Sequence, residues 1–296
     1  STAEIKAAIT LQTTATSNIG LGANAVNSIT TGDHNVGLGD NALTGATSGG
    51  SSVAIGTGAL QTMTTQSDNV AVGLNALRDN TASHTTALGS YALYQNTSGA
   101  GNTALGYTAL ESNTTGASNT AVGKDSLDAN TTGSYNTAVG LDSLTANTTG
   151  SKNTAVGRDA LQASTTSDGN SAFGAGSLYT NITGNSNTAV GQECMFSNTT
   201  GTENTAIGRY ALDANTTAIS NTAVGAYSLS GTTTGSYNTG IGEAALLSNT
   251  TGASNSALGK DALRANTTGA SNAVSYTHLR AHETPEHLVC RLLLEK

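Results

Sequence analysis

The sequence predicts an all-β fold, a parallel β-solenoid of about fifteen coils with 17 residues in each coil. Triplets such as A-V-G and A-L-G recur at one spacing along most of the chain. The composition is also unusual for 296 residues, with 36 Gly, no Trp and only 10% charged residues, since a globular domain normally carries more large and charged side chains. Stacked coils explain both features, because each coil needs few apolar residues to close a thin core.

The repeat is marked by the glycine that closes each triplet, from Gly22 to Gly259. Successive glycines are 17 residues apart, except between Gly73 and Gly89, where a deletion leaves 16. The unit reads N-T-A-V-G-x-x-A-L-x-x-N-T-T-G-x-x, as in residues 119–135, and its positions are numbered here 1 to 17 from the first Asn. The internal Gly and Asn-Thr-Thr-Gly exclude a helix of this length. The unit therefore indicates one solenoid coil.

Each unit predicts two short extended segments, at positions 1–4 and 8–10, and turn residues follow each of them. Glycine at positions 5 and 15 is expected to supply positive φ at the corners. Parallel stacking places position 4 over position 4 and the Leu of position 9 over Leu, so the predicted core is a column of Val beside a column of Leu. The residues chosen to represent it are Val122, Leu127, Val139, Leu144, Val156, Leu161, Leu212, Leu246 and Leu263.

Asparagine recurs at position 12, where the carboxamide of one coil can hydrogen-bond to those of the coils above and below. The predicted ladder comprises Asn113, Asn130, Asn147, Asn198, Asn215, Asn249 and Asn266. These residues also stand in N-x-[ST] triplets, which are glycosylation acceptors in secreted eukaryotic proteins. Their recurrence at one repeat position favours the ladder.

Positions 3 and 8 carry small side chains in almost every unit. Neighbouring side chains on a strand point to opposite faces, so positions 3 and 4 cannot both face one core. We therefore expect the small residues to form a second apolar face that packs against other copies of the chain. The alternative is that they line the corners, since exposed Ala is common.

Both ends depart from the repeat. Residues 1–17 are a lead-in without a unit of their own, the repeat domain covers residues 18–274, and residues 275–296 break the pattern with the only Pro, Pro285. This last segment resembles a translated sequencing adapter and is interpreted as a non-native tail, which is set aside from functional reasoning. The chain is expected to be an internal piece of a longer protein.

A row of carboxylates is the one candidate metal site. Asp125, Asp142 and Asp159 occupy position 7 of consecutive coils, and stacked carboxylates are a weak candidate for a Ca²⁺ ladder. The G-G-x-G-x-D motif of calcium-binding solenoids is absent. A solvated row, partly neutralised by Lys124 and Arg158, is the favoured interpretation, and no other metal and no cofactor is expected.

Other chemistry finds little support. Cys194 stands at position 8, where other units have Ala or Ser, and is interpreted as structural. His34 and His84 are isolated and belong to no Ser/His/Asp pattern, and no phosphate-binding loop is present. The net charge of −8 without a basic stripe argues against nucleic acid. The sequence contains no run of 18 apolar residues, so no membrane span is predicted. The acidic residues are dispersed, so no enzyme is predicted.

The motifs S-S-V-A-I-G at residues 51–56 and N-V-A-V-G at residues 69–73 resemble the head repeats of trimeric autotransporter adhesins, the YadA-like head. In that family the repeat folds as a left-handed parallel β-roll and three chains form a trimer. The family's unit is shorter and lacks the inserted N-T-T-G turn. The later units also resemble fibre repeats of marine bacteria and phages that end in an intramolecular chaperone. The resemblance covers residues 18–274 and implies a homotrimer.

Two functions are therefore expected from the sequence. The first is a structural segment of an extracellular fibre or adhesin, on a cell surface or a virion, in which a trimeric rod holds a binding end towards an unknown host-surface or matrix receptor. Multivalency would strengthen weak contacts. The alternative is an ice-binding β-solenoid, in which Thr at position 2 and the aliphatic residue at position 4 share one regular face. That alternative requires position 4 to be outside the core.

Overall fold

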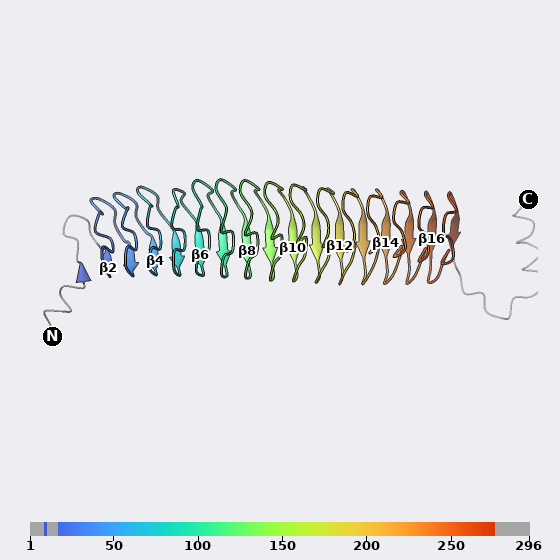
Figure 1. Ribbon diagram of the computed structural model, residues 1–296, viewed down its shortest axis with the longest axis horizontal. Helices are drawn as coiled ribbons and strands as arrows, with labels where there is room; N and C mark the ends of the chain where they lie inside the picture. The colour runs from blue at the N-terminus through green and yellow to red at the C-terminus, as the bar shows by residue number, and fades with distance from the viewer. Residues whose placement is uncertain (1–8, 11–16, 276–296) are drawn as a thin grey trace, which may run out of the picture.

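The described residues form one rod of stacked coils, shown in Figure 1. The computed structural model describes residues 9–10 and 17–275. Most of the predicted lead-in and residues 276–296 of the predicted tail lie outside this range. Within it, each unit makes one coil with a single three-residue strand, and 16 such strands follow one another in parallel register.

Almost all the strands lie at repeat positions 2–4. They are β2 (Ile19–Leu21), β3 (Val36–Leu38), β4 (Val53–Ile55), β5 (Val70–Val72), β6 (Thr86–Leu88), β7 (Thr103–Leu105), β8 (Thr120–Val122), β9 (Thr137–Val139), β10 (Thr154–Val156), β11 (Ser171–Phe173), β12 (Thr188–Val190), β13 (Thr205–Ile207), β14 (Thr222–Val224), β15 (Thr239–Ile241), β16 (Ser256–Leu258) and β17 (Ala273–Ser275). The remaining strand, β1 (Ile9–Thr10), pairs antiparallel with β2.

Equivalent positions stack directly in this sheet. In β8 and β9, for example, Thr120 pairs with Thr137 and Ala121 pairs with Ala138. The register holds across the 16-residue unit, because β5 pairs with β6 at the same positions. The missing residue is lost from the turn after Asn80, whose carboxamide bonds the carbonyl two residues on rather than three. The predicted parallel solenoid with coils of about 17 residues is confirmed.

The second predicted strand is wrong. Positions 8–10 form a turn, because the backbone at positions 7 and 9 is left-handed, with φ of 54° at Asp125 and 53° at Leu127. The turns nevertheless stack, since the Leu127 amide donates to the carbonyl of Ser143 in the next coil at 3.1 Å. Each coil therefore has one strand and two stacked turn segments.

The two corner glycines serve different purposes. At position 5 the predicted positive φ is confirmed, and Gly123 has φ of 136°. At position 15 the prediction is wrong for Gly133, which is not among the residues with positive φ. Glycine is needed there for space, since a Cβ on Gly133 would lie 2.3 Å from the carbonyl oxygen of Gly150 and 2.5 Å from Oδ1 of Asn130.

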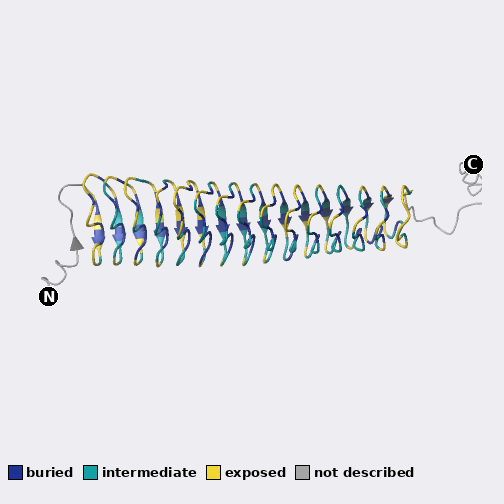
Figure 2. Ribbon diagram, turned by 45° about the horizontal axis from the view of Figure 1, so that its top comes forward, coloured by how far each residue is buried: buried dark blue, intermediate teal, exposed yellow. Residues whose placement is uncertain are grey.

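The Leu column of the predicted core is confirmed. Leu127, Leu144, Leu161, Leu212 and Leu246 are fully buried, and Leu263 in the last complete coil is half-buried. Figure 2 shows buried residues recurring at the same place in successive coils.

The prediction that a Val column lies in the core is wrong. Val122, Val139 and Val156 are only half-buried and lie on the outer side of their strands, while the Ala at position 3 faces inwards with no exposed surface. The cause is the width of the coil. Where position 3 is Gly20, even an added Cβ would lie 2.2 Å from the Val26 side chain at position 9. Only Ala or Gly fits between the sheet and the Leu column.

The small residues at positions 3 and 8 consequently form the core rather than a second face. Ala121 and Ser126 both have no exposed surface, so the expectation that these positions pack against other copies is wrong. The side chains at positions 3 and 4 do point to opposite faces of the strand, as expected. The prediction placed position 4 inside and position 3 outside, whereas the structure has the reverse. The outer side now holds positions 2 and 4, which makes it the surface of interest.

Candidate functional site

The outer face of the parallel sheet is an uncharged surface that runs the length of the rod. Here the name outer face means the side chains at positions 2 and 4 of β2–β16. Position 4 supplies Leu21, Leu38, Ile55, Val72, Leu88, Leu105, Val122, Val139, Val156, Phe173, Val190, Ile207, Val224, Ile241 and Leu258. These side chains stack through the direct register of neighbouring strands, about 4.8 Å apart. The result is one continuous stripe, here called the aliphatic stripe although it includes the aromatic Phe173.

Much of this stripe is accessible to solvent. Leu88 is 45% exposed, Leu105 43% and Ile207 42%, whereas Val122, Val139 and Val156 in the middle of the rod are half-buried. Large apolar side chains with that exposure usually occur singly, and a contiguous patch marks a contact surface. The stripe is therefore a candidate contact surface, because its exposed apolar side chains are contiguous.

Position 2 divides the outer face into two parts. In β2–β5 it is Ile19, Val36, Val53 and Val70, so the face has two aliphatic rows. In β6–β16 it is Thr or Ser, so a hydroxyl row runs beside the aliphatic row. The two rows are neighbours on the same side of each strand, because their positions differ by two.

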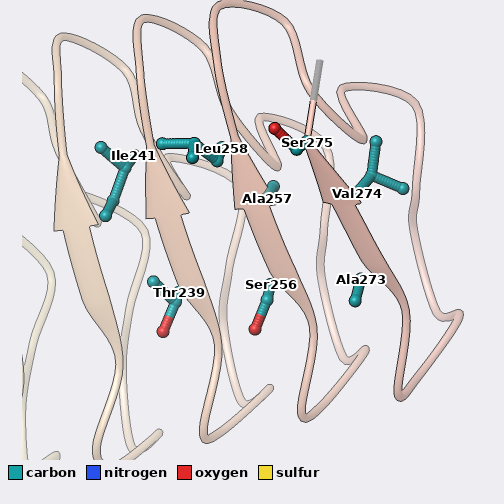
Figure 3. Close-up of a pocket in the computed structure, with 8 residues that line it drawn as sticks. All are labelled: Thr239, Ile241, Ser256, Ala257, Leu258, Ala273, Val274 and Ser275. Carbon is teal, nitrogen blue, oxygen red and sulfur yellow. The ribbon is translucent and has the colours of Figure 1, made fainter. Parts of the chain in front are cut away.

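The outer face has a depression at the C-terminal end of the described rod. A depression of about 400 Å³ is lined mainly by side chains of β15, β16 and β17. Figure 3 shows Thr239 beside Ser256, and Ile241 beside Leu258, on adjacent strands. Ala273 and Ser275 follow them in register on β17. The hollow arises because these two side chains are smaller than the Thr and aliphatic residues that precede them. Among the described residues, no titratable group lines it.

The predicted Asn ladder is confirmed at position 12. Asn130 Nδ2 donates to Asn113 Oδ1 at 2.7 Å, and Asn147 Nδ2 donates to Asn130 Oδ1 at 2.8 Å. Asn215 bonds Asn198 in the same way, and Asn266 bonds Asn249. Most of these side chains are fully buried. Their carboxamide nitrogens are occupied and inaccessible, which disfavours glycosylation of the folded rod.

A second Asn ladder, at position 1, was not predicted. The backbone amide of Asn136 donates to Asn119 Oδ1 at 2.9 Å, and Asn119 Nδ2 donates to the carbonyl of Gly133 at 2.9 Å. That carbonyl also accepts from Asn130 at 3.0 Å, so the two ladders meet at position 15. The signal was available, since Asn opens most units as regularly as it occupies position 12.

Two of the three aspartates in the predicted position-7 row, Asp125 and Asp159, are paired with cations, whereas Asp142 follows the uncharged Leu141. Asp125 Oδ2 lies 2.8 Å from Lys124 Nζ, and Thr108 donates a short hydrogen bond to its other oxygen. Burial alone would raise the pKa of Asp125, but these hydrogen bonds hold it below its ordinary value. Asp159 lies 3.4 Å from Arg158 Nε. Across the described residues no group of three or more His, Cys, Asp or Glu is placed to hold a metal ion.

The remaining candidate residues are buried or isolated. Cys194 is fully buried, and burial raises the pKa of its thiol to about 12, so it is not a nucleophile in the folded rod. His84 lies on the surface, 3.6 Å from Asp68, and His34 is exposed on another coil. Within the part of the chain that the structure describes, no helix is long and apolar enough to cross a membrane.

Comparison with known proteins adds no relative. No family model matches the chain, and no curated protein and no solved structure does so either. The functional argument therefore rests on the rod itself and on its outer face.

Proposed function

We propose that this chain is a rigid structural rod that associates with copies of itself through the outer face of its sheet, as a segment of an extracellular fibre or adhesin. The observation that carries the proposal is the continuous, uncharged aliphatic stripe on that face. Water exposure of such a stripe is unfavourable, and its burial against a partner would stabilise an assembly.

A second copy is the partner that fits the stripe best. The stripe repeats at the strand spacing, and another rod of the same chain presents side chains at the same period. Fifteen strands give a face about 70 Å long and about 10 Å wide, or roughly 700 Å², close to the ~800 Å² per partner of a standard interface. Because positions 2 and 4 carry no charged residues, the contact itself would place no like charges against each other.

A closed assembly of three rods around a common axis is proposed, in line with the resemblance of the repeats to trimeric adhesin heads. In such an assembly each outer face turns to the axis. The polar turns and the charged residues at positions 6, 7 and 10 then form the surface that meets solvent. A rod of this kind holds a binding end away from a surface, and three copies multiply weak contacts.

Light scattering of the full chain in solution tests this proposal. A trimer has a mass of 3 × 29.3 kDa, or about 88 kDa. Substituting Val139→Asp and Val156→Asp together should give a folded monomer, since both residues lie on the outer face. The matched control is Thr132→Asp, at an exposed turn position of the same region, which should leave the assembly intact. A folded wild-type monomer at high concentration would exclude the fibre proposal.

Ice binding is a second candidate, because position 4 lies outside the core. On β6–β16 the Thr or Ser of position 2 and the aliphatic residue of position 4 form a regular two-row array on one side of the sheet. The fibre requires the outer face to be buried in an assembly, whereas ice binding requires the same face to be exposed to water. A monomeric rod that produces thermal hysteresis, and loses it in Val139→Asp, would favour ice binding over the fibre.

A further inference from the structure

The position-12 ladder inside the rod is interrupted twice. In an intact stretch each carboxamide nitrogen donates both its hydrogens, one to Oδ1 of the preceding coil and one to the position-15 carbonyl of its own coil. Asn113 makes these bonds at 2.7 and 2.9 Å, and Asn130 at 2.7 and 3.0 Å. The ladder runs unbroken from Asn80 to Asn147. Position 12 is then Ser164, and later Thr232, in place of Asn.

The break at Ser164 is partly repaired within its own coil. The Ser164 hydroxyl pairs with the hydroxyl of Ser167 at 2.5 Å, and Ser167 also accepts from Asn170 at 3.0 Å. Ser167 stands at position 15, where the smaller Ser164 leaves room for a Cβ that an Asn would exclude. One buried atom, Oδ1 of Asn147, is left without a hydrogen-bond partner among the described residues.

The break at Thr232 is not repaired. Oδ1 of Asn215 and Oγ1 of Thr232 are both buried and have no hydrogen-bond partner within the described chain. The side chain of Thr232 is fully buried, so exposed solvent does not serve it. On the far side, Nδ2 of Asn249 bonds only the carbonyl of Gly252, without the inter-coil bond that Asn130 and Asn147 make.

Two further contacts are weakened at the same place. Position 15 of the coil that contains Asn215 is Ala218, and the bond from Asn215 Nδ2 to its carbonyl is lengthened to 3.4 Å, against 2.9 Å at Asn113. The backbone bond from Thr216 to Thr233 is 3.1 Å, against 2.9 Å from Thr114 to Thr131, and the equivalent bond at the Ser164 break, from Thr165 to Ile182, is 3.2 Å. The two unpaired atoms and the two lengthened bonds therefore lie together where residues 204–220 meet residues 221–237.

We propose that this coil interface is a built-in opening point, at which the rod separates locally before it does so elsewhere. A solenoid is a one-dimensional array whose stability is a sum over coils and coil interfaces, so a weak interface divides it into blocks that open independently. Buried polar atoms without partners cost free energy that is recovered when opening admits water. The rod would thus yield, when heated or pulled, between β13 and β14 and keep its N-terminal block folded.

This inference is independent of the proposed function, since it concerns the interior of one chain. Amide hydrogen exchange of the full chain tests it by comparing peptides from two equivalent interfaces. Peptides over residues 216–233 should exchange about tenfold faster, or more, than peptides over residues 114–131, because each unpaired buried group destabilises the closed state by a factor of that order. Association of copies would not remove a difference measured within one molecule.

Thr232→Asn is the decisive variant, because it restores the residue that the ladder lacks. An Asn there can donate to Asn215 Oδ1 and accept from Asn249 Nδ2, and exchange over residues 216–233 should slow about tenfold. The matched control, Thr234→Asn, changes an exposed turn residue of the same coil and should have no effect. The reverse variant, Asn130→Thr, should create a fast-exchanging interface in the intact stretch.

Two results would overturn the proposal. One is equal exchange over residues 216–233 and residues 114–131 in the wild-type rod. The other is a Thr232→Asn variant that folds but exchanges as fast as wild type at this interface, because the break would then carry no energetic weight.

Discussion

The first three coils and the later coils share one backbone but fill it differently. At position 12 the first three coils have Ile29, Ala46 and Met63, all buried, whereas most later coils have a hydrogen-bonded Asn. Position 2 changes within the same region, from the aliphatic residues of β2–β5 to the Thr and Ser of β6–β16. The N-terminal end of the rod is therefore apolar at interior position 12 and at outer position 2. The longer remaining part is mostly polar at both of these positions.

The comparison separates what the fold requires from what it tolerates. In the complete coils both regions keep Gly at position 5 and Ala or Gly at position 3, and position 9 is buried in every coil but the last, where Leu263 is half-buried. The interior at position 12 accepts either an apolar side chain or a carboxamide, provided that the carboxamide finds partners in the neighbouring coils. The fold thus requires a fixed backbone shape. The side chain at position 12 can be apolar or a carboxamide, but each kind must continue along a run of coils.

The largest expected effect comes from the glycine that both regions share. Gly140 has φ of 139°, and a Cβ there would lie 2.5 Å from the carbonyl oxygen of Gly157. Gly140→Ala should lower the free energy of unfolding by about 3 kcal/mol or more, because strain and a backbone clash add. Gly39→Ala, in the first region, should do the same, since its Cβ would lie 2.7 Å from the backbone of Gly56.

Urea unfolding followed by circular dichroism measures both variants. Gly101→Ser is the matched control, because an added Cβ at Gly101 would make only ordinary contact, 3.7 Å from Ser118 Oγ, and its φ of 69° resembles that of Ser118 at the same repeat position. If Gly140→Ala melted like Gly101→Ser, the stacking of position-5 glycines would not be what holds the coils at their spacing.

An intermediate effect should distinguish the two regions at position 12. Asn130→Met places the first region's side chain in the ladder, leaves Asn113 Oδ1 without a donor, and removes one of the two acceptors of Asn147 Nδ2. The expected loss is about 2–3 kcal/mol, since two buried polar atoms each lose a hydrogen-bond partner. Met63→Leu, a volume-conserving change in the apolar stretch, should cost less than about 1.5 kcal/mol. Similar losses in the two variants, measured by urea unfolding, would mean that the ladder adds nothing beyond filling space.

The sequence predicts the coil length, the parallel stack, the Leu column and the position-12 ladder because each depends on recurrence at one position. It does not predict which side of the strand faces inwards. Alternation requires positions 3 and 4 to differ, and hydrophobicity favours Val122 over Ala121. The interior is instead set by the left-handed turn at Asp125 and Leu127, which brings position 9 so close to the sheet that only Ala or Gly fits. That width is a property of the closed coil and cannot be read from one strand.

The outer face was missed for the same reason. The expectation of self-association was attached to small residues that the structure buries, and the aliphatic stripe was assigned to the core. Once Val139 and its equivalents are known to point outwards, the same residues support association on stronger grounds, because exposed aliphatic side chains lose more by facing water than exposed Ala does.

The smallest expected effect concerns position 10, where the first three coils have uncharged side chains and later coils include Glu111 and Asp128. Asp128 is half-buried, and its Oδ1 has no hydrogen-bond partner among the described residues. Burial raises the pKa of Asp128 to about 6, and the nearby carboxylates of Asp125, Glu111 and Asp142 add to the rise. The ordinary pKa of Asp is 3.8, so between that pH and about 6 the folded rod binds more protons than the unfolded chain. Stability should therefore fall as pH rises through this window.

Asp128→Asn removes the titrating group and should stabilise the rod at pH 7 by about 1 kcal/mol, a value discounted because the carboxyl is only half-buried. Near pH 3.5 Asp128 is protonated in the folded rod and largely so in the unfolded chain, and the variant should differ little from wild type. Gln61→Glu, at position 10 of the first region, is the reciprocal change and should introduce a loss of stability with rising pH. Urea midpoints at the two pH values measure both variants. An Asp128→Asn rod that weakened between pH 3.5 and 7 as much as wild type would place the pH dependence elsewhere, and the difference between the two regions at position 10 would then have no electrostatic consequence.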